Sequence, residues 1–215
     1  NGSKNYNPLA MIEENPSETE FKRTQIIGKA SLEIIEGLTW NANYSYLDSQ
    51  HTYSGYNTRK SQLEGLSSKN GQASRNTYFG KEHTFETYGN FERTFADAHK
   101  VNLMAGYSWE GRKTGDGFGL TVHDFYNDDL LWNNLTYAST IDGIPAVQSG
   151  TKQNVRNISF YGRLSYSYNS RYMFQATVRR DGSSVFGKDN RWATFPSFSA
   201  AWNITDESFM EDQEL

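Results

Sequence analysis

Apolar and polar residues alternate along most of this chain, and that alternation limits the possible folds more than any other feature. In the segment ISFYGRLSYSY (158–168), every second residue is apolar, aromatic or glycine, and the residues between them are mostly polar. Successive side chains of a strand point to opposite faces, so a period of two predicts amphipathic β-strands. A similar run follows Asn169-Ser170, which is typical of a β-hairpin.

The pattern recurs and predicts an all-β fold, with about seven antiparallel up-and-down strands, most of about 10 to 14 residues. Short turns are predicted at 36–37, 97–99 and 169–170, and longer connections at 54–81, 113–153 and 182–191. Short and long connections alternate, so all the short turns lie at one end of the sheet. Tight turns at one end and long loops at the other are typical of outer-membrane β-barrels.

Large aromatic rings are expected at both ends of the apolar face. The chain is only 36% apolar but 15% aromatic, so rings provide much of its hydrophobic surface. Near the short turns the predicted rings are Trp40, Phe95, Tyr168, Tyr172 and Trp202, and toward the other end they are Phe85, Trp109 and Phe160. Two aromatic girdles that flank an apolar band are typical of a barrel wall in contact with lipid.

The opposite face of the predicted strands is polar and should meet water. It carries Lys29, Glu33, Asn41, Asn43, Glu86, Asn90, Glu92, Asn102, Arg163, Gln175 and Arg179. Net charge is −4 and no basic stripe is present, which argues against a nucleic-acid partner. Cysteine is absent, and no run of about 18 apolar residues predicts a membrane-spanning helix.

The stretch RRDGSSVFGKDNRWATFPSFSAAWNITDESFM (179–210) resembles the barrel of SusC/RagA-like TonB-dependent outer-membrane transporters. In that family an Arg-x-Asp-Gly-Ser-Ser-x-Phe-Gly run leads into Asn-Arg-Trp-x-x-Phe-Pro-Ser. The matching residues are Asp181, Gly182, Ser183, Ser184, Phe186, Gly187, Asn190, Arg191, Trp192, Phe195, Pro196, Ser197 and Trp202. The resemblance is specific over about 155–212 and general, in strand and loop character, before that.

The resemblance implies a role in the bacterial outer membrane. Residues 1–215 would form part of a 22-stranded β-barrel domain, without the N-terminal plug, the TonB box or the closing strand. Family members import glycan oligomers or peptides together with a SusD-like lipoprotein, and TonB supplies energy through the N-terminal region. The implied partners are therefore membrane lipid, that lipoprotein, TonB and the solute, and no cofactor is implied.

Two roles are open for the motif between the last two predicted strands. Pro196 suits a rim or a bulge, Gly182 and Gly187 permit tight turns, and Arg191 would pair with Asp181 or Asp189, all of which describe a rigid rim hairpin. The alternative is direct contact between the substrate and Arg191 or Trp192.

The segment GDGFGLTVHDFYNDDLLWNNLTY (115–137) is predicted to be an outer loop that meets a substrate or the lipoprotein. Candidates for these contacts are Asp124, Tyr126, Asn127, Trp132, Asn133 and Asn134, with Tyr137 as a further stacking ring. Asp124, Asp128 and Asp129 are weak candidates for Ca²⁺ because carboxylates are its usual ligands, but EF-hand spacing is missing. The glycines of GDGFG are interpreted as loop flexibility. A folded outer loop packed by its own aromatic rings is the other interpretation.

No enzymatic constellation is found. The four histidines are scattered, a G-x-S-x-G elbow is absent, and adjacent carboxylates such as Glu13-Glu14 would splay apart on a strand. The chain is therefore predicted not to be an enzyme. Two alternatives to an importer remain: a secreted β-sandwich that binds carbohydrate through loop aromatics, and a barrel-borne surface hydrolase or adhesin.

Overall fold

The computed structural model describes residues 7–63, 69–141 and 147–210. The chain divides into two compact units. Unit 1 comprises Asn1–Thr24, Leu47–Lys81 and Lys113–Gln153, and unit 2 comprises Gln25–Tyr46, Glu82–Arg112 and Asn154–Leu215. The long strands contribute to both units, and each unit is described by itself.

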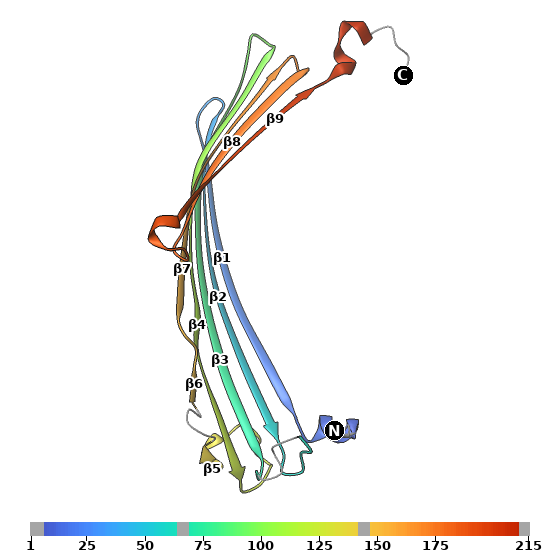
Figure 1. The fold of residues 1–215 in the computed structure, drawn as a ribbon, viewed down its shortest axis with the longest axis vertical. Coiled ribbons are helices and arrows are strands. Elements are labelled where there is room, and N and C mark those ends of the chain that lie inside the picture. Colours follow the sequence, from blue (N-terminus) through green and yellow to red (C-terminus); the bar gives the residue numbers. More distant parts are fainter. Residues whose placement is uncertain (1–6, 64–68, 142–146, 211–215) are drawn as a thin grey trace. The chain divides into compact units, whose positions relative to one another are not determined.

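All strands in the described residues belong to one antiparallel sheet, in which neighbours follow the order β1-β2-β3-β4-β7-β8-β9 (Figure 1). The strands are β1 (Ser17–Ile35), β2 (Leu38–Asn57), β3 (Gln72–Phe95), β4 (His99–Phe125), β5 (Ala138–Ile141), β6 (Val147–Ser149), β7 (Gln153–Tyr168), β8 (Tyr172–Ser183) and β9 (Trp192–Trp202). The helices are α1 (Pro8–Glu13) and the single 3-10 turns η1 (Leu135–Tyr137), η2 (Lys188–Asn190), η3 (Ile204–Asp206) and η4 (Ser208–Met210). In the described part of the chain, every helix is too short or too polar to cross a membrane.

The predicted fold class is confirmed, with one correction to strand length. Strands β1 to β4 contain 19, 20, 24 and 27 residues, well beyond the predicted 10 to 14. In β3 and β4 much of the extra length comes from the segments that the sequence assigned to the long connections 54–81 and 113–153. A β-sandwich requires two sheets packed face to face, whereas these strands form a single sheet. The sandwich alternative is therefore wrong.

The short turns of unit 2 follow the geometry that tight hairpins require. Asn169 and Ser170 both have positive φ, 50° and 56°, which is the type I′ pattern whose twist matches that of paired strands. At the preceding turn the two central residues are Ala96 and Asp97, with φ of 48° and 54°. The prediction placed that turn at 97–99, but His99 already belongs to β4.

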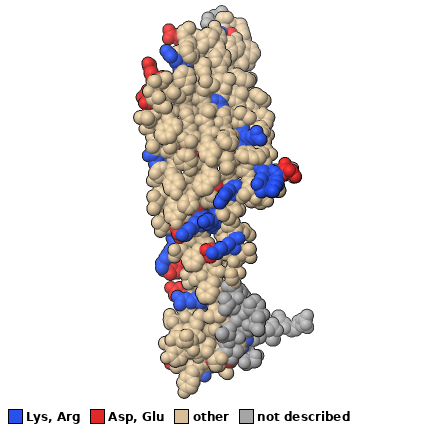
Figure 2. Space-filling model, turned by 90° about the vertical axis from the view of Figure 1, so that its left-hand side faces the viewer, with Lys and Arg blue, Asp and Glu red and all other residues tan. Residues whose placement is uncertain are grey.

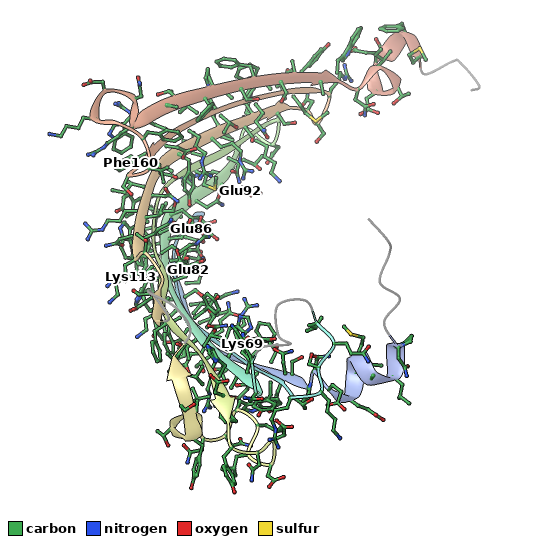
Figure 3. All side chains as sticks on the ribbon, turned by 60° about the horizontal axis from the view of Figure 1, so that its bottom comes forward. Lys69, Glu82, Glu86, Glu92, Lys113 and Phe160 are labelled. Carbon is green, nitrogen blue, oxygen red and sulfur yellow. The ribbon has the colours of Figure 1, made fainter. Side chains whose placement is uncertain are left out.

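The two faces of unit 2 differ as the alternation predicts. Figure 3 shows Glu82, Glu86 and Glu92 on one side of the sheet and Phe160 on the other. We call these the polar face and the apolar face. On the apolar face the predicted rings near the short turns are all exposed: Trp40, Phe95, Tyr168, Tyr172 and Trp202. At the other end Phe160 is exposed, whereas Phe85 and Trp109 are half-buried.

Unit 1 contains a small hydrophobic core built from strand ends and an outer loop. Its buried residues are Tyr56, Ala73, Val122 and Phe125, with Leu120, Leu131, Trp132, Leu135 and Ala138 packed against them. The outer part of β4 pairs with β5 through Val122 and Ile141, and with β6 through Leu120 and Val147. The segment predicted as a long loop therefore contains strands and a core.

Candidate functional site

The β8–β9 hairpin places alternate residues of the sequence motif on opposite faces. Arg179 is paired with Phe195, and Asp181 with Ala193, on the polar face. Gly182 is paired with Trp192 on the apolar face. Directly paired residues of antiparallel strands share a face, so this short motif places some of its side chains on the polar face and others on the apolar face.

Arg179 is the centre of a hydrogen-bonded cluster on the polar face. Its Nε donates to both carboxylate oxygens of Asp181, at 2.7 and 3.1 Å, and its Nη2 donates to Ser159 Oγ at 3.1 Å. Its guanidinium lies 5.9 Å from the ring centroid of Tyr161, whose hydroxyl donates to Glu86 Oε1 at 2.7 Å. These contacts link three strands and fix the direction of the Arg179 side chain. We call Arg179, Asp181, Ser159, Tyr161 and Glu86 the polar-face cluster.

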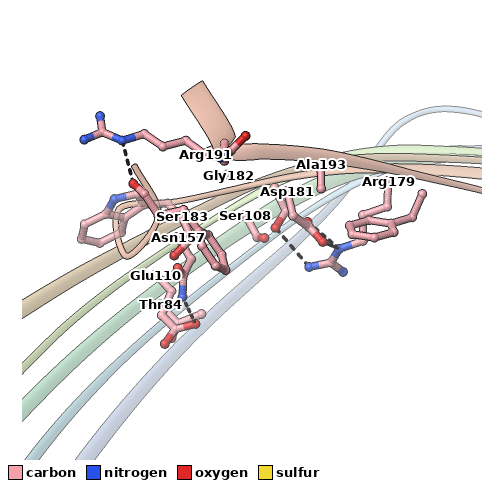
Figure 4. Close-up of a pocket in the computed structure, with 15 residues that line it drawn as sticks. Thr84, Ser108, Glu110, Asn157, Arg179, Asp181, Gly182, Ser183, Arg191 and Ala193 are labelled. Carbon is pink, nitrogen blue, oxygen red and sulfur yellow. Dashed lines mark hydrogen bonds and ion pairs between the residues drawn. The ribbon is translucent and has the colours of Figure 1, made fainter. Parts of the chain in front are cut away.

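A cavity of about 380 Å³ adjoins this cluster (Figure 4). Arg179 and Asp181 line it together with Glu110 and the rings of Phe186 and Phe195. Charged groups thus stand beside apolar rings in one concave site. Such a combination suits a polar solute that also carries apolar surface, as sugars and peptides do.

Arg191 does not pair with either predicted carboxylate. Its Nε donates to the carbonyl oxygen of Phe186 at 3.3 Å, and Figure 4 shows its guanidinium turned away from Arg179 and Asp181. Asp181 is held by Arg179 instead. The predicted ion pair is wrong because Arg179, two residues before Asp181 on the same face of β8, occupies that carboxylate, whereas Arg191 precedes β9 in a helical backbone conformation (φ −69°, ψ −24°). Arg191 still holds the hairpin loop, through a backbone carbonyl.

Trp192 lies on the apolar face, where the sequence interpretation did not place it. It stacks on Phe160 with ring centroids 6.2 Å apart. Trp192 and Trp202 are the first and last residues of β9, ten positions apart and therefore on the same face. At ~3.3 Å per residue and a tilt of ~40°, they are separated by about 25 Å along the barrel axis. The apolar band of an outer-membrane barrel has about this height.

Glu207 ties the segment after β9 to the aromatic residues near the short turns. Its carboxylate accepts hydrogen bonds from Tyr172 Oη at 2.5 Å and Trp202 Nε1 at 3.0 Å, and pairs with Arg171 Nη1 at 2.9 Å. Glu207 is only 9% exposed. The hydrogen bond from Tyr172, followed by those from Trp202 and Arg171, holds the pKa of Glu207 below its ordinary value of 4.5.

We expect acidification to release this segment. A carboxylate with a lowered pKa stabilises the folded state fully above its ordinary pKa, and that stabilisation is lost as the pH falls through the lowered value. Hydrogen exchange of residues 203–210 in the full-length parent protein should accelerate in that range. Glu207→Gln should show fast exchange already at pH 7, with little further change on acidification. Equal protection of the variant and the parent at pH 7 would contradict this role.

The carboxylates proposed for Ca²⁺ each have partners of their own. Asp128 accepts a hydrogen bond from Tyr56 Oη at 2.8 Å and pairs with Arg59 Nε at 3.6 Å. Asp124 pairs with His123 and Asp129 with Asn127, both at 2.8 Å. No group of three or more metal-ligating residues occurs within residues 7–63, 69–141 and 147–210. The structure does not bring the three carboxylates together.

The remaining loop candidates divide into folded and accessible residues. Trp132 packs against the core of unit 1, and Asn134 accepts hydrogen bonds at the start of η1. Asp124 belongs to β4. Tyr126, which is 88% exposed, Asn127 and Asn133 face solvent. These three residues remain candidates for contact with a substrate or a lipoprotein.

Comparison with known proteins identifies the family. The family model described as TonB dependent receptor-like, beta-barrel, matches residues 1–209. The chain therefore belongs to this family.

Relatives of known name agree. TonB-dependent receptor P3 of Formosa agariphila is 30% identical over 210 residues, which is 96% of this chain and 20% of that protein. SusC of Bacteroides thetaiotaomicron is 54% identical over 55 residues, or 26% of this chain and 6% of that protein. This chain thus spans at most about a fifth of these relatives.

A solved structure supports the same fold. The chain superposes on the structure of the RagAB peptide transporter with a TM-score of 0.82 and 20% sequence identity. The match covers 94% of this chain and 22% of the other. The SusC/RagA-like resemblance inferred from the motif is confirmed.

Proposed function

We propose that this chain forms wall strands and outer loops of a TonB-dependent importer in the bacterial outer membrane. Its solutes are glycan oligomers or peptides, which it takes up together with a SusD-like lipoprotein. The observation that carries the proposal is the division of unit 2 into two faces. Exposed rings on the apolar face stand about 25 Å apart along the barrel axis on β9, the height that a lipid bilayer requires.

The polar face supports transport rather than anchoring alone. A barrel lumen meets water, and the polar face of unit 2 carries the polar-face cluster and its adjoining cavity. The peptide class is supported by the RagAB structure, which is that of a peptide transporter, and the SusC match, 54% identical over 55 residues, supports the SusC/RagA-like resemblance that implies both solute classes. Arg179 would bind a carboxylate, carbonyl or hydroxyl group of the passing solute.

Substitution of Arg179 in the full-length parent tests this function. We expect Arg179→Ala to reduce uptake at least tenfold, because a charge-assisted contact contributes roughly 1.5–3 kcal/mol. Uptake of fluorescent peptides and of fluorescent oligosaccharides would be measured in separate arms, in cells with and without TonB. Uptake should require TonB. The amount of folded barrel, read from its heat-dependent gel mobility, should not change.

Arg93→Ala provides the control. Arg93 is also exposed, but its guanidinium lies over Phe95 at 5.5 Å, on the apolar face. This variant should transport as well as the parent. Uptake that is independent of TonB, or equal in Arg179→Ala and the parent for both solutes, would contradict the proposed function.

A further inference from the structure

A group of basic residues lies on the apolar face at the outer end of β7, β8 and β9. Phe160 is paired with Arg180, and Gly182 with Trp192, so these four residues share that face. Arg156 continues it, because its backbone N–H donates to Ser184 Oγ at 2.8 Å and its carbonyl accepts from Ser184 N at 2.9 Å.

The group forms a shaped site rather than a scatter of charges. Arg156, Arg191 and Trp192 line a hollow of about 200 Å³ together with Ser184. The Arg180 guanidinium lies 5.3 Å from the centroid of the Trp192 ring. That ring rests on Gly182, where a Cβ would come within 2.8 Å of it. We call Arg156, Arg180, Arg191 and Trp192 the basic hollow.

The positive charge of the basic hollow is not neutralised by the protein. Throughout the described part of the chain, no carboxylate forms an ion pair with Arg156, Arg180 or Arg191. Asp181, next to Arg180, points to the polar face and is held by Arg179. Figure 2 shows this side of the protein, on which Lys and Arg side chains are interspersed with Asp and Glu side chains and large areas carry neither. Three guanidinium groups therefore remain available to an anion.

The position of the hollow identifies the anion. Trp192 is the ring that marks the outer limit of the apolar band on β9, so the hollow lies at the level of lipid headgroups. Arginine on the lipid-facing side of a barrel is strongly unfavourable at the bilayer midplane but nearly neutral near the interface. Guanidinium groups bind phosphate oxygens in paired geometry. At this level of the membrane, phosphate groups are provided by anionic lipid headgroups.

We infer that the basic hollow binds the phosphate of a lipid headgroup in the outer leaflet, with Trp192 as the platform that orients Arg180. This inference rests on the membrane position given under Proposed function. Arg179 and Arg180 point to opposite faces of β8, so the first arginine contacts the solute and the second contacts the lipid.

Binding of phosphorylated lipid A to the purified full-length parent in detergent tests the inference, with native mass spectrometry as the readout. The Arg156→Gln/Arg180→Gln double variant should bind at least about tenfold less lipid A, since it loses two of the three guanidinium groups that attract the headgroup phosphate. Arg179→Ala should bind as the parent does. Lipid A from which the phosphates have been removed should bind the parent as weakly as phosphorylated lipid A binds the double variant.

Three results would overturn the inference. They are equal lipid A binding by the double variant and the parent, equal binding of phosphorylated and dephosphorylated lipid, and displacement of the lipid by millimolar inorganic phosphate. The last would assign the hollow to free phosphate. Heat-dependent gel mobility verifies that each variant is a folded barrel. Uptake by Arg179→Ala is measured independently, so a failure of the proposed import function can be distinguished from a failure of the lipid-binding inference.

Discussion

Arginine in place of Phe198 is expected to destabilise the assembled parent barrel by about 2–4 kcal/mol. Phe198 lies on the apolar face of β9 between Trp192 and Trp202, is 71% exposed, and is paired with Ala176. A guanidinium at this level would lie in hydrocarbon, away from either interface. The measurement is a urea titration of the full-length protein in lipid vesicles, followed by heat-dependent gel mobility.

The neighbouring residue provides the matched control. Ser197 is paired with Thr177 on the polar face, so Ser197→Arg places the same side chain in water. Its effect should stay within about 0.5 kcal/mol, as for most surface substitutions. If both variants unfold at the same urea concentration, the apolar face of β9 does not contact lipid, and the wall assignment fails.

Gly117→Ala is expected to have the second large effect, a loss of about 3 kcal/mol or more in unit 1. A Cβ at Gly117 would stand 2.0 Å from the carbonyl oxygen of Thr77, which is backbone and cannot move without parting β3 from β4. Thr77 Oγ1 also bonds to the backbone N–H and carbonyl of Phe118. Overpacking typically costs about 1–3 kcal/mol, and more where the backbone must shift. Hydrogen exchange of residues 72–80 would report the separation.

Gly89→Ala is the control on the same strand pair. No atom lies within 4 Å of a Cβ built at Gly89, so alanine should be neutral or slightly stabilising. Equal exchange in the two variants would show that β3 and β4 do not approach as closely at Gly117 as described.

The alternation predicted the architecture because it reports directly on which side of a strand each residue faces. The hairpin at Asn169-Ser170, the all-antiparallel sheet and the exposed rings near the short turns all follow from that period of two. A barrel wall is a single sheet. Odd and even positions of a strand therefore face its two sides, and no second sheet packs against either side to change that pattern.

The outer part of β4 was missed because its glycines were interpreted as flexible. Phe118, Leu120 and Val122 alternate there, but Gly115, Gly117 and Gly119 occupy the positions between or before them. Gly117 is required by the close approach of Thr77, which is a property of the neighbouring strand. The sequence alone does not distinguish a glycine that is needed for backbone flexibility from one that is needed because a Cβ would clash with a neighbouring strand.

The candidate site was predicted only in part. The motif residues do meet in one hairpin, but the partner of Asp181 is Arg179, because register decides which side chains adjoin across strands. Trp192 and Trp202 are an even number of positions apart, and this spacing could have predicted from the sequence that they lie on the same face. The link from Arg179 through Tyr161 to Glu86 joins residues far apart in the chain, and no local pattern indicates it.

Adjacent arginines in β8 point to opposite sides of a sheet one residue thick. Deleting a single amino acid between Tyr172 and Arg179 would therefore move every strand residue on one side of the deletion to the opposite face. Guanidinium groups would then lie on the apolar face and aromatic rings on the polar face. Changes in chain length are consequently tolerated in the connecting segments, while the strands can change only by substitution. Within the strands, evolutionary change is therefore expected to proceed by substitution, which leaves every other residue on its own face of the sheet.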